Sequence, residues 1–116
     1  MQHSSFNYLR AHRKRAALSE EELARLLGGV TASLVCRLEG GTREPTGKFM
    51  LGCEVVFGVA PRDMFPGRYG GVEESVMRRA ARLSAALEGK VDAVSASKRR
   101  LLEDMIKRAR DNHDGA

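Results

Sequence analysis

Two cysteines and three histidines are the residues of this 116-residue chain that could ligate a metal ion or act as nucleophiles. Cys36 and Cys53 are far apart, and neither belongs to the closely spaced cysteine or histidine pairs that a tetrahedral zinc site needs. The histidines are scattered, at His3, His12 and His113. The spacing therefore predicts two reduced thiols and no metal site, with a redox-sensing Cys36 as the alternative.

Residue sets typical of catalysis are also missing from the sequence. It contains no Ser-His-Asp or Cys-His arrangement, no phosphate-binding GxxxxGK[ST] motif and no carboxylate cluster with metal-ligand spacing. We therefore expect a protein that is not an enzyme and that needs no cofactor.

The charge of the chain favours a polyanionic partner. Lys and Arg number 20 against 15 Asp and Glu, which gives a formal net charge of +5. A basic surplus on a small protein is a weak indication of nucleic acid binding. No stretch approaches about 18 uninterrupted apolar residues, and the first residues lack the apolar segment of a secretory signal. We expect a cytoplasmic protein with no membrane partner.

The composition predicts an all-α fold. Hydrophobic residues make up 42 % of the chain and charged residues 30 %, which is typical of a globular protein. Ala, Leu, Glu and Arg dominate and there is a single Ile, so the bias is strongly helical. The length fits one domain, or one small domain with an extension.

Glycine and proline divide the chain into two modules. Ten of the twelve glycines lie in residues 28–71, and all three prolines precede residue 67. The run from Pro66 to Gly71 is expected to break a helix, which predicts a Gly-rich linker at residues 67–71. The modules are then residues 1–66, with short helices, and residues 72–116, with two longer ones.

Capping residues and glycines predict five short helices in the first module. Ser19, followed by three glutamates, makes a capping box, and Thr31 is a second cap. Short helices with brief connections are typical of a compact all-α bundle. The expected helices run from Ser4 or Ser5 to Arg15–Ala17, from Ser19 to Leu27, from Thr31 to Glu39, from Gly47 to Phe57 and from Pro61 to Phe65.

The second and third of these helices, joined by a glycine-containing turn, have the layout of a helix-turn-helix. The residue pattern is more specific than the layout, since it includes Leu23-Ala24, the Arg-Leu-Glu-x-Gly at 37–41 and Phe57-Gly58-Val59. Over about residues 6–65 the chain resembles the Cro/CI-type helix-turn-helix family, also called XRE-type or lambda-repressor-like. The resemblance implies a five-helix bundle that binds DNA.

The resemblance also implies which residues meet the DNA. Thr31–Glu39 would be the recognition helix in the major groove, and Arg37 is the best candidate for base readout because a guanidinium can donate two hydrogen bonds to guanine. Its alternative is a solvated side chain paired with Glu22 or Glu39. The other residues expected at bases are Thr31, Ala32, Ser33 and Leu34. Those expected along the phosphates are Thr42, Arg43 and Lys48, together with the backbone amides near Gly41.

Three further positions are interpreted through the same resemblance. Arg13 and Glu39 occupy positions that this family often pairs, which predicts a structural ion pair. Glu20 stands where the family usually has a Gln that touches the DNA backbone, so that contact is expected to be lost or turned aside. One extra residue at Gly28-Gly29 is expected to shift the recognition helix.

Apolar positions within the five helices predict the core. The fourth helix departs from the usual pattern, since Gly52 in a helix interior costs about 1 kcal/mol relative to Ala. Glu54, in the same helix, either finds a partner or makes a contact peculiar to this chain. The expected core residues are Leu9, Leu18, Leu23, Ala24, Leu27, Val35, Leu38, Leu51, Val55 and Val59.

Residues 72–116 are expected to form a two-helix extension. The first helix has one apolar stripe and an opposite solvated face, and the second begins at Asp92 or Ser95. Because the first module is complete without the extension, we expect it to form a homodimer, the alternative being a hairpin that covers its own domain. The stripe comprises Val72, Val76, Ala80, Leu83 and Leu87, and the solvated face Glu73, Glu74, Arg78, Arg79 and Arg82.

These observations favour a sequence-specific regulator of transcription that binds double-stranded DNA as a homodimer and represses by covering a promoter. The alternative is an antitoxin or interaction module whose helix-turn-helix has drifted and which binds a partner protein. Glu20 and the apolar Ala32 and Leu34 favour this alternative.

Overall fold

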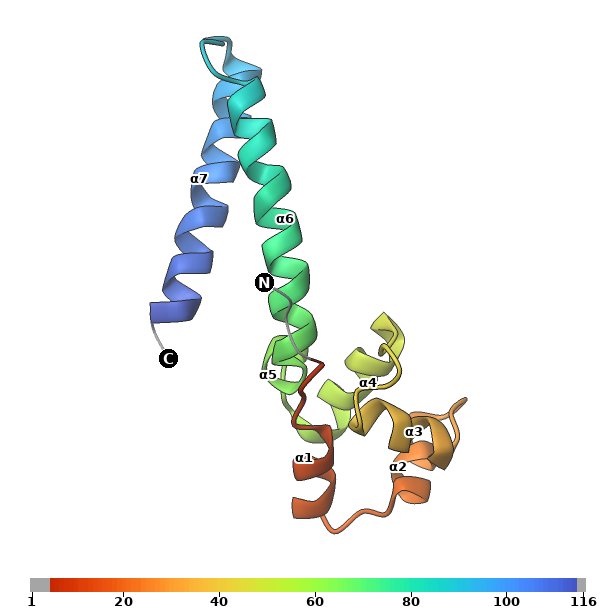
Figure 1. Ribbon diagram of the computed structural model, residues 1–116. Helices are drawn as coiled ribbons and strands as arrows, with labels where there is room; N and C mark the ends of the chain where they lie inside the picture. The colour runs from red at the N-terminus through yellow and green to blue at the C-terminus, as the bar shows by residue number, and fades with distance from the viewer. Residues whose placement is uncertain (1–4, 115–116) are drawn as a thin grey trace. The chain divides into compact units, whose positions relative to one another are not determined.

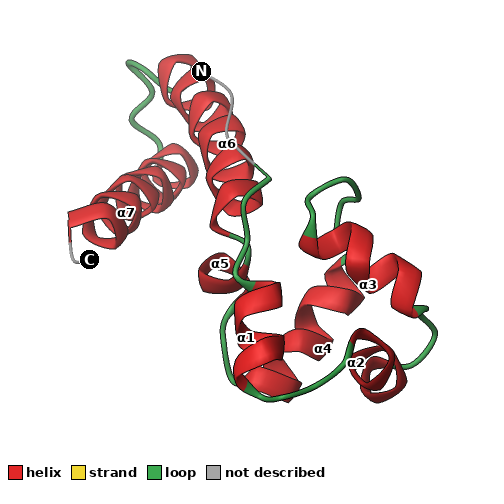
Figure 2. Ribbon diagram, turned by 60° about the horizontal axis from the view of Figure 1, so that its bottom comes forward, coloured by secondary structure: helices red, strands yellow, loops and turns green. Residues whose placement is uncertain are grey.

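The computed structural model describes residues 5–114, and in this part of the chain every regular element is a helix, as the composition predicts (Figures 1 and 2). Helices account for 74 % of the structure, with no strand among the described residues. His3 and Ser4 lie outside the described residues. The helices are α1 (Leu9–Arg15), α2 (Glu20–Leu27), α3 (Ala32–Glu39), α4 (Gly47–Phe57), α5 (Pro61–Met64), α6 (Pro66–Ala86) and α7 (Ala93–Asp114).

The chain divides into two compact units, residues 1–71 and residues 72–116. Helices α1 to α5 belong to the first unit and α7 to the second, and the boundary falls within α6.

The prediction of a linker at residues 67–71 is wrong, because these residues are helical. Pro66 is the first residue of α6, where a proline is tolerated because no amide hydrogen is needed. Tyr69 N donates to Phe65 O at 2.9 Å. Arg68 Nη2 donates to Gly41 O at 3.2 Å, so the first turn of α6 is bonded to the rest of the first unit.

Helix α1 begins at Leu9, so Ser5 does not cap it. Asn7 supplies the missing polar contacts instead. Its Oδ1 accepts from Leu9 N at 3.0 Å, and its Nδ2 donates to Leu38 O, also at 3.0 Å. This asparagine therefore fixes the entry to α1 and connects it to the end of α3.

The caps predicted for α2 and α3 are confirmed. Ser19 Oγ accepts from Glu22 N at 3.0 Å while Glu22 Oε1 accepts from Ser19 N at 2.9 Å, which completes a capping box. Thr31 Oγ1 accepts from Leu34 N at 3.1 Å. Both α2 and α3 thus begin at the residues that the local sequence specifies.

Five predicted core residues are buried, but two in α4 are not. Leu51 is 61 % exposed and Val55 is 86 % exposed, so their assignment to the core is wrong. Helix α4 is apolar on almost every side, so its pattern does not select a face, and it buries Phe49 and Cys53 instead. Leu18, Leu27 and Val59 are half-buried. The buried cluster consists of Leu9, Leu23, Ala24, Val35, Leu38, Phe49, Cys53, Met64 and Phe65.

In the second unit, Asp92 rather than Ser95 caps α7. Ser95 N donates to Asp92 Oδ2 at 3.0 Å and Ser95 Oγ donates to Asp92 Oδ1 at 2.7 Å. These hydrogen bonds hold the pKa of Asp92 below its ordinary value. Arg99 Nη1 donates to Leu87 O at 3.1 Å, which bonds α7 to the end of the preceding helix.

The faces of this hairpin differ from the prediction. Glu73, expected in the solvated face, is half-buried, and its Oε1 lies 2.7 Å from Nε2 of His113. In the predicted apolar stripe, Val72, Val76 and Leu83 are 59 %, 41 % and 46 % exposed. Of the stripe, only Leu87 is buried. Helices α6 and α7 therefore leave most of this apolar stripe partly exposed.

Candidate nucleic-acid interface

Helix α3 has one buried face and one exposed face. Val35 and Leu38 are fully or almost fully buried in the core. Ser33, Cys36 and Arg37 are exposed, as expected of residues three and four positions apart on the opposite side of a helix. The core thus fixes α3 by its inner face and leaves this outer face free for a partner.

Arg37 extends along the outer face of α3 and makes its contacts within that helix. Its Nη2 donates to Ser33 Oγ at 3.2 Å and its Nε to Ser33 O at 3.5 Å. It forms no ion pair with any described residue. The proposed pairing with Glu22 or Glu39 is therefore absent. Since a guanidinium carries five N–H donors, most of them remain free for a ligand.

Ala32 and Leu34 differ from the exposed residues of α3. Both are half-buried, and Leu34 packs against the core cluster. Leu34 also lines a pocket together with Arg43 and Lys48, two of the residues predicted along the phosphates. Ser33 and Arg37 do not line it. The structure therefore separates the predicted site residues into an outer group on α3 and a second group around this pocket.

The backbone at the end of α3 is already hydrogen-bonded. Gly41 has φ +78°. Gly41 N donates to Leu38 O at 3.2 Å and Thr42 N to Arg37 O at 3.0 Å, a Schellman arrangement. Two of the amides near Gly41, those of Gly41 and Thr42, are therefore already hydrogen-bonded within the chain. Thr42 Oγ1 also donates to Arg37 O, at 3.2 Å. The other two residues predicted along the phosphates, Arg43 and Lys48, are cationic and form no ion pair with any described residue.

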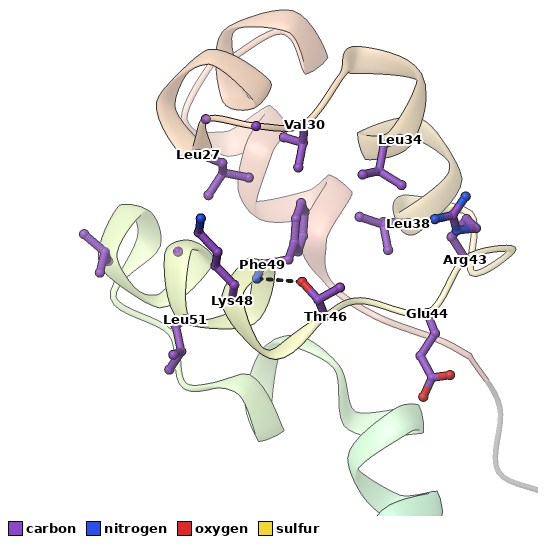
Figure 3. A pocket seen from close by; sticks show the side chains of 14 residues that line it. Leu27, Val30, Leu34, Leu38, Arg43, Glu44, Thr46, Lys48, Phe49 and Leu51 are labelled. Carbon is purple, nitrogen blue, oxygen red and sulfur yellow. Dashed lines mark hydrogen bonds between the residues drawn. The ribbon is translucent and has the colours of Figure 1, made fainter.

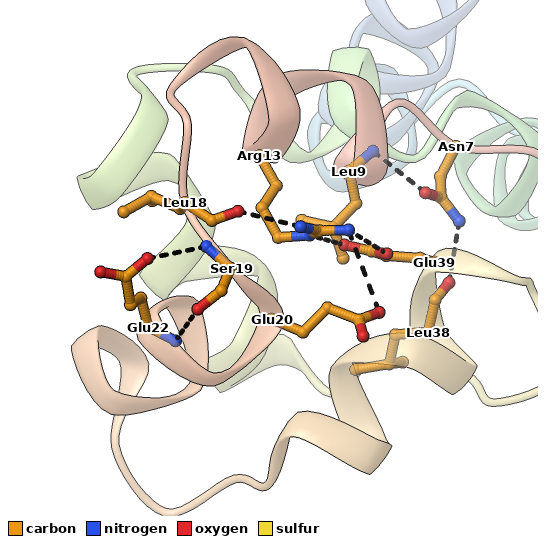
Figure 4. A network of polar contacts seen from close by, with 9 residues as sticks. All are labelled: Asn7, Leu9, Arg13, Leu18, Ser19, Glu20, Glu22, Leu38 and Glu39. Atoms are coloured by element: carbon orange, nitrogen blue, oxygen red, sulfur yellow. Dashed lines mark hydrogen bonds and ion pairs between the residues drawn. The ribbon is translucent and has the colours of Figure 1, made fainter.

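The ion pair predicted between Arg13 and Glu39 is present and lies inside the first unit (Figure 4). Only 9 % of the Arg13 side chain and 4 % of the Glu39 side chain are exposed. Arg13 Nε donates to Glu39 Oε2 and its Nη2 to Glu39 Oε1 at 3.1 Å, while its Nη1 donates to Leu18 O at 2.9 Å. Hydrogen bonding to Glu39 holds the pKa of Arg13 above its ordinary value. One side chain thus joins α1, the entry to α2 and the end of α3.

Glu20, at the first position of α2, also faces this ion pair. Its Oε2 lies 4.0 Å from Nη2 of Arg13, and its side chain is one-third exposed (Figure 4). The carboxylate therefore contacts a buried cation of its own chain. The expected loss or turning aside of a contact between Glu20 and the DNA backbone stays a prediction.

The two cysteines have different environments. Burial raises the pKa of Cys53 to about 12, so its thiol is protonated and inert at neutral pH. Cys36 is exposed on the outer face of α3, one position before Arg37. Cys36 is not among the predicted interface residues, although its spacing of three from Ser33 places it on the same side of the helix.

Neither a metal site nor a membrane span emerges from the described residues. No group of three or more His, Cys, Asp or Glu side chains within residues 5–114 is arranged to hold a metal ion. Over the same residues, none of the helices combines the length and the apolar character needed to cross a bilayer. Comparison of the chain with protein-family models, with curated proteins and with solved structures finds no match.

Proposed function

We propose that this chain is a sequence-specific regulator of transcription that binds double-stranded DNA as a homodimer, in the manner of Cro/CI-type helix-turn-helix repressors. The observation that carries the proposal is the outer face of α3. Ser33 and Arg37 are exposed there, without a carboxylate partner, on a helix whose inner face is fixed by Val35 and Leu38.

In this proposal α3 lies in the major groove and Arg37 reads a guanine. Two hydrogen bonds from one guanidinium to O6 and N7 discriminate against the wrong base by about 1–3 kcal/mol. The hydrogen bond from Arg37 Nη2 to Ser33 Oγ uses a single donor and orients the side chain along the helix. Arg43 and Lys48 would contact phosphates, which positions the protein without reading sequence.

The position of Glu20 removes an obstacle to this proposal. A carboxylate directed at a phosphate would repel it, but Glu20 lies within 4.0 Å of the Arg13 guanidinium. Its negative charge is therefore partly compensated within the protein.

The second unit would supply the dimer contact. Its exposed apolar side chains include Val72, Val76 and Leu83 on α6 and Leu101 and Ile106 on α7. Val72, Val76 and Leu83 are spaced four and seven residues apart, which places them along one side of α6, and an exposed apolar stripe of this kind is typical of interaction sites. A dimer with two-fold symmetry would present two copies of α3 to half-sites about 34–36 Å apart and cover the DNA between them.

Selection of bound duplexes from a random pool by the purified protein tests the proposal. The expected result is an enriched palindromic sequence, with two half-sites separated by about one helical turn. Titration at several salt concentrations then counts the phosphate contacts. If each protomer of the dimer uses Arg43 and Lys48, log K falls with log salt with a slope of about −3.6, or −0.9 for each phosphate. No enriched sequence, or binding that does not respond to salt, would contradict the proposal.

A second candidate function is that of an antitoxin or interaction module that binds a partner protein. The exposure of Leu51 and Val55 on α4 favours it, since these apolar side chains have no cover in the first unit. Salt separates the two functions, because an apolar protein interface barely responds to salt while binding through several phosphates weakens steeply.

A further inference from the structure

A pocket of about 490 Å³ lies in the first unit between the turn after α2, helix α3 and helix α4 (Figure 3). Most of its wall is apolar. A concave site of this size, lined by apolar groups with a few polar ones, is typical of a small-molecule site. The apolar side chains that form its wall include Leu27, Val30, Leu34, Phe49, Leu51 and Val55.

The charged side chains around the pocket give it a cationic rim. Lys48 and Arg43 line it and form no ion pair with any described residue. Glu44 also lines it, but its carboxylate points away from the apolar side chains, whereas Lys48 extends toward Leu27 (Figure 3). An anionic group bound beside the apolar wall would therefore find an unpaired ammonium group.

Gly52 explains part of the shape of this pocket. It is a helix-interior residue of α4, where glycine costs about 1 kcal/mol relative to alanine. A Cβ atom at this position would lie 2.8 Å from Cδ2 of Leu27, so the end of that side chain would have to move. The bare backbone thus lets α4 approach Leu27 and forms part of the wall.

We propose that this pocket binds a small amphipathic carboxylate, with an acyl chain against the apolar wall and the carboxylate at Lys48. The volume of the pocket fits a small ligand, and its unpaired cations favour an anion over a neutral apolar compound.

The position of the pocket also gives the ligand a regulatory effect, and this step rests on the proposed function. Lys48 and Arg43 are the cations expected on DNA phosphates, and Leu34 belongs to α3 itself. A carboxylate bound at Lys48 competes with one phosphate in each protomer. It should therefore make the salt slope of DNA binding of a dimer shallower by about 1.8, or 0.9 for each lost contact.

The first experiment measures binding of octanoate to the full chain in the absence of DNA, by amide chemical shifts in NMR spectra. We expect saturable binding, with shifts concentrated at Val30, Leu34 and Gly52. Leu51→Glu is the disruptive variant, because Leu51 is exposed and its replacement spares the core. Losing the burial of one leucine weakens binding about tenfold. Val91→Glu, at a 91 % exposed position outside this pocket, is the matched control and should bind as the wild type does.

A second comparison tests recognition of the carboxylate. Lys48→Met should weaken octanoate binding about two- to fivefold, the value of an exposed ion pair. Binding of octan-1-ol, which lacks the charge, should be unaffected by this variant. Lys90→Met serves as the control. Equal affinity for the acid and the alcohol, with no effect of Lys48→Met, would overturn the assignment of the carboxylate site.

The remaining outcomes distinguish a ligand site from a protein interface and from failure of the proposed DNA binding. If octanoate does not bind, or binds Leu51→Glu as well as the wild type, the pocket proposal is overturned. If it does not bind and Leu51→Glu turns a sedimenting dimer into a monomer, the pocket is a protein interface and the proposal is again overturned. If octanoate binds as expected while no DNA is selected, the ligand site stands and the proposed DNA function fails. If DNA is bound with the same salt slope with and without octanoate, the regulatory step is overturned.

Discussion

Arg13 determines how the first unit holds its helices together. Its guanidinium donates to the Glu39 carboxylate and to Leu18 O, and Glu20 lies 4.0 Å from it. A buried ion pair of this kind adds little net stability compared with apolar packing, but removal of one partner leaves an uncompensated buried charge. The contacts of Arg13 therefore connect α1, the entry to α2 and the end of α3.

Replacing Glu39 with Ala should lower the free energy of unfolding by about 3–5 kcal/mol, because Arg13 then remains buried without its carboxylate. Unfolding in urea, followed by circular dichroism, measures the loss. Glu21→Ala breaks the exposed pair with Arg25 and serves as the control, with an expected loss below about 1 kcal/mol. Equal losses for the two variants would show that the buried pair has no special role.

The Glu22 carboxylate makes the start of α2 sensitive to acid. Its hydrogen bonds with Ser19, the backbone bond first, hold the pKa of Glu22 below its ordinary value. Because the pKa of Glu22 is lower in the folded protein than in the unfolded chain, its ionised carboxylate stabilises the fold. This stabilisation is complete above the pKa of the unfolded chain and is lost as pH falls through the pKa of the folded protein. Ser19→Ala removes the hydroxyl but keeps the backbone amide of residue 19, so we expect it to raise the Glu22 pKa only part of the way toward its ordinary value, as measured by carboxyl carbon chemical shifts. Identical titration curves in the two proteins would refute this role of the capping box.

Among the features of the helices, the sequence predicts those that depend on residues close together in the chain, such as the caps. The caps at Ser19 and Thr31 involve side chains that bond to amides three positions later, so their short motifs were sufficient. The face that α4 buries depends on contacts with other elements, and an apolar helix has no periodic pattern to reveal it. The prediction of a linker at residues 67–71 fails because the contacts that hold this turn of helix, such as Arg68 to Gly41 O, are distant in sequence.

The candidate site was predictable to a similar extent. The outward position of Ser33 and Arg37 follows from helical spacing, since Val35 and Leu38 select the inner face. The Arg13–Glu39 pair spans a long sequence separation, and only a resemblance could suggest it. No local motif identifies the pocket wall, because its residues come from three helices and the connections between them.

Gly41 ends α3 in a conformation that other residues adopt at a cost. Its φ is +78°, and a Cβ atom there would lie 2.3 Å from Ser5 Oγ. Gly41→Ala should therefore destabilise the protein by about 1–3 kcal/mol. Gly47→Ala, at a helical position with open space around it, should leave stability unchanged or raise it by up to about 1 kcal/mol. Thermal unfolding of both variants gives the comparison, and a harmless Gly41→Ala would contradict the assigned strain.

The positive charge is spread along the chain, and exposed apolar side chains occur in both units, those of the second unit on α6, on α7 and between them. Residues 1–50 carry eight Lys and Arg against five acidic residues, and residues 72–116 carry ten against eight. A surplus of this size supports moderate attraction to DNA, while sequence specificity would come from contacts with base edges. The exposed Val72, Val76 and Leu83 then account for how two copies would associate.

Val76→Glu should convert the dimer to a monomer, because it places a charge in the middle of the exposed apolar stripe. Sedimentation equilibrium of the wild type and the variant measures the change, with Val91→Glu as the control that remains dimeric. A monomeric wild type, or a Val76→Glu variant that is still a dimer, would contradict dimerisation through the second unit.

The central proposal, that α3 reads DNA sequence, depends most directly on Arg37. The decisive measurement is the ratio of two affinities, one for the selected duplex and one for a duplex in which a guanine common to the selected sequences is replaced. The ratio is determined for the wild type, for Arg37→Ala and for Arg82→Ala. We predict that Arg37→Ala folds normally and loses about five- to 150-fold of this discrimination, the equivalent of about 1–3 kcal/mol, while Arg82→Ala, at an exposed position of the second unit, keeps it. Full discrimination by Arg37→Ala would contradict the account.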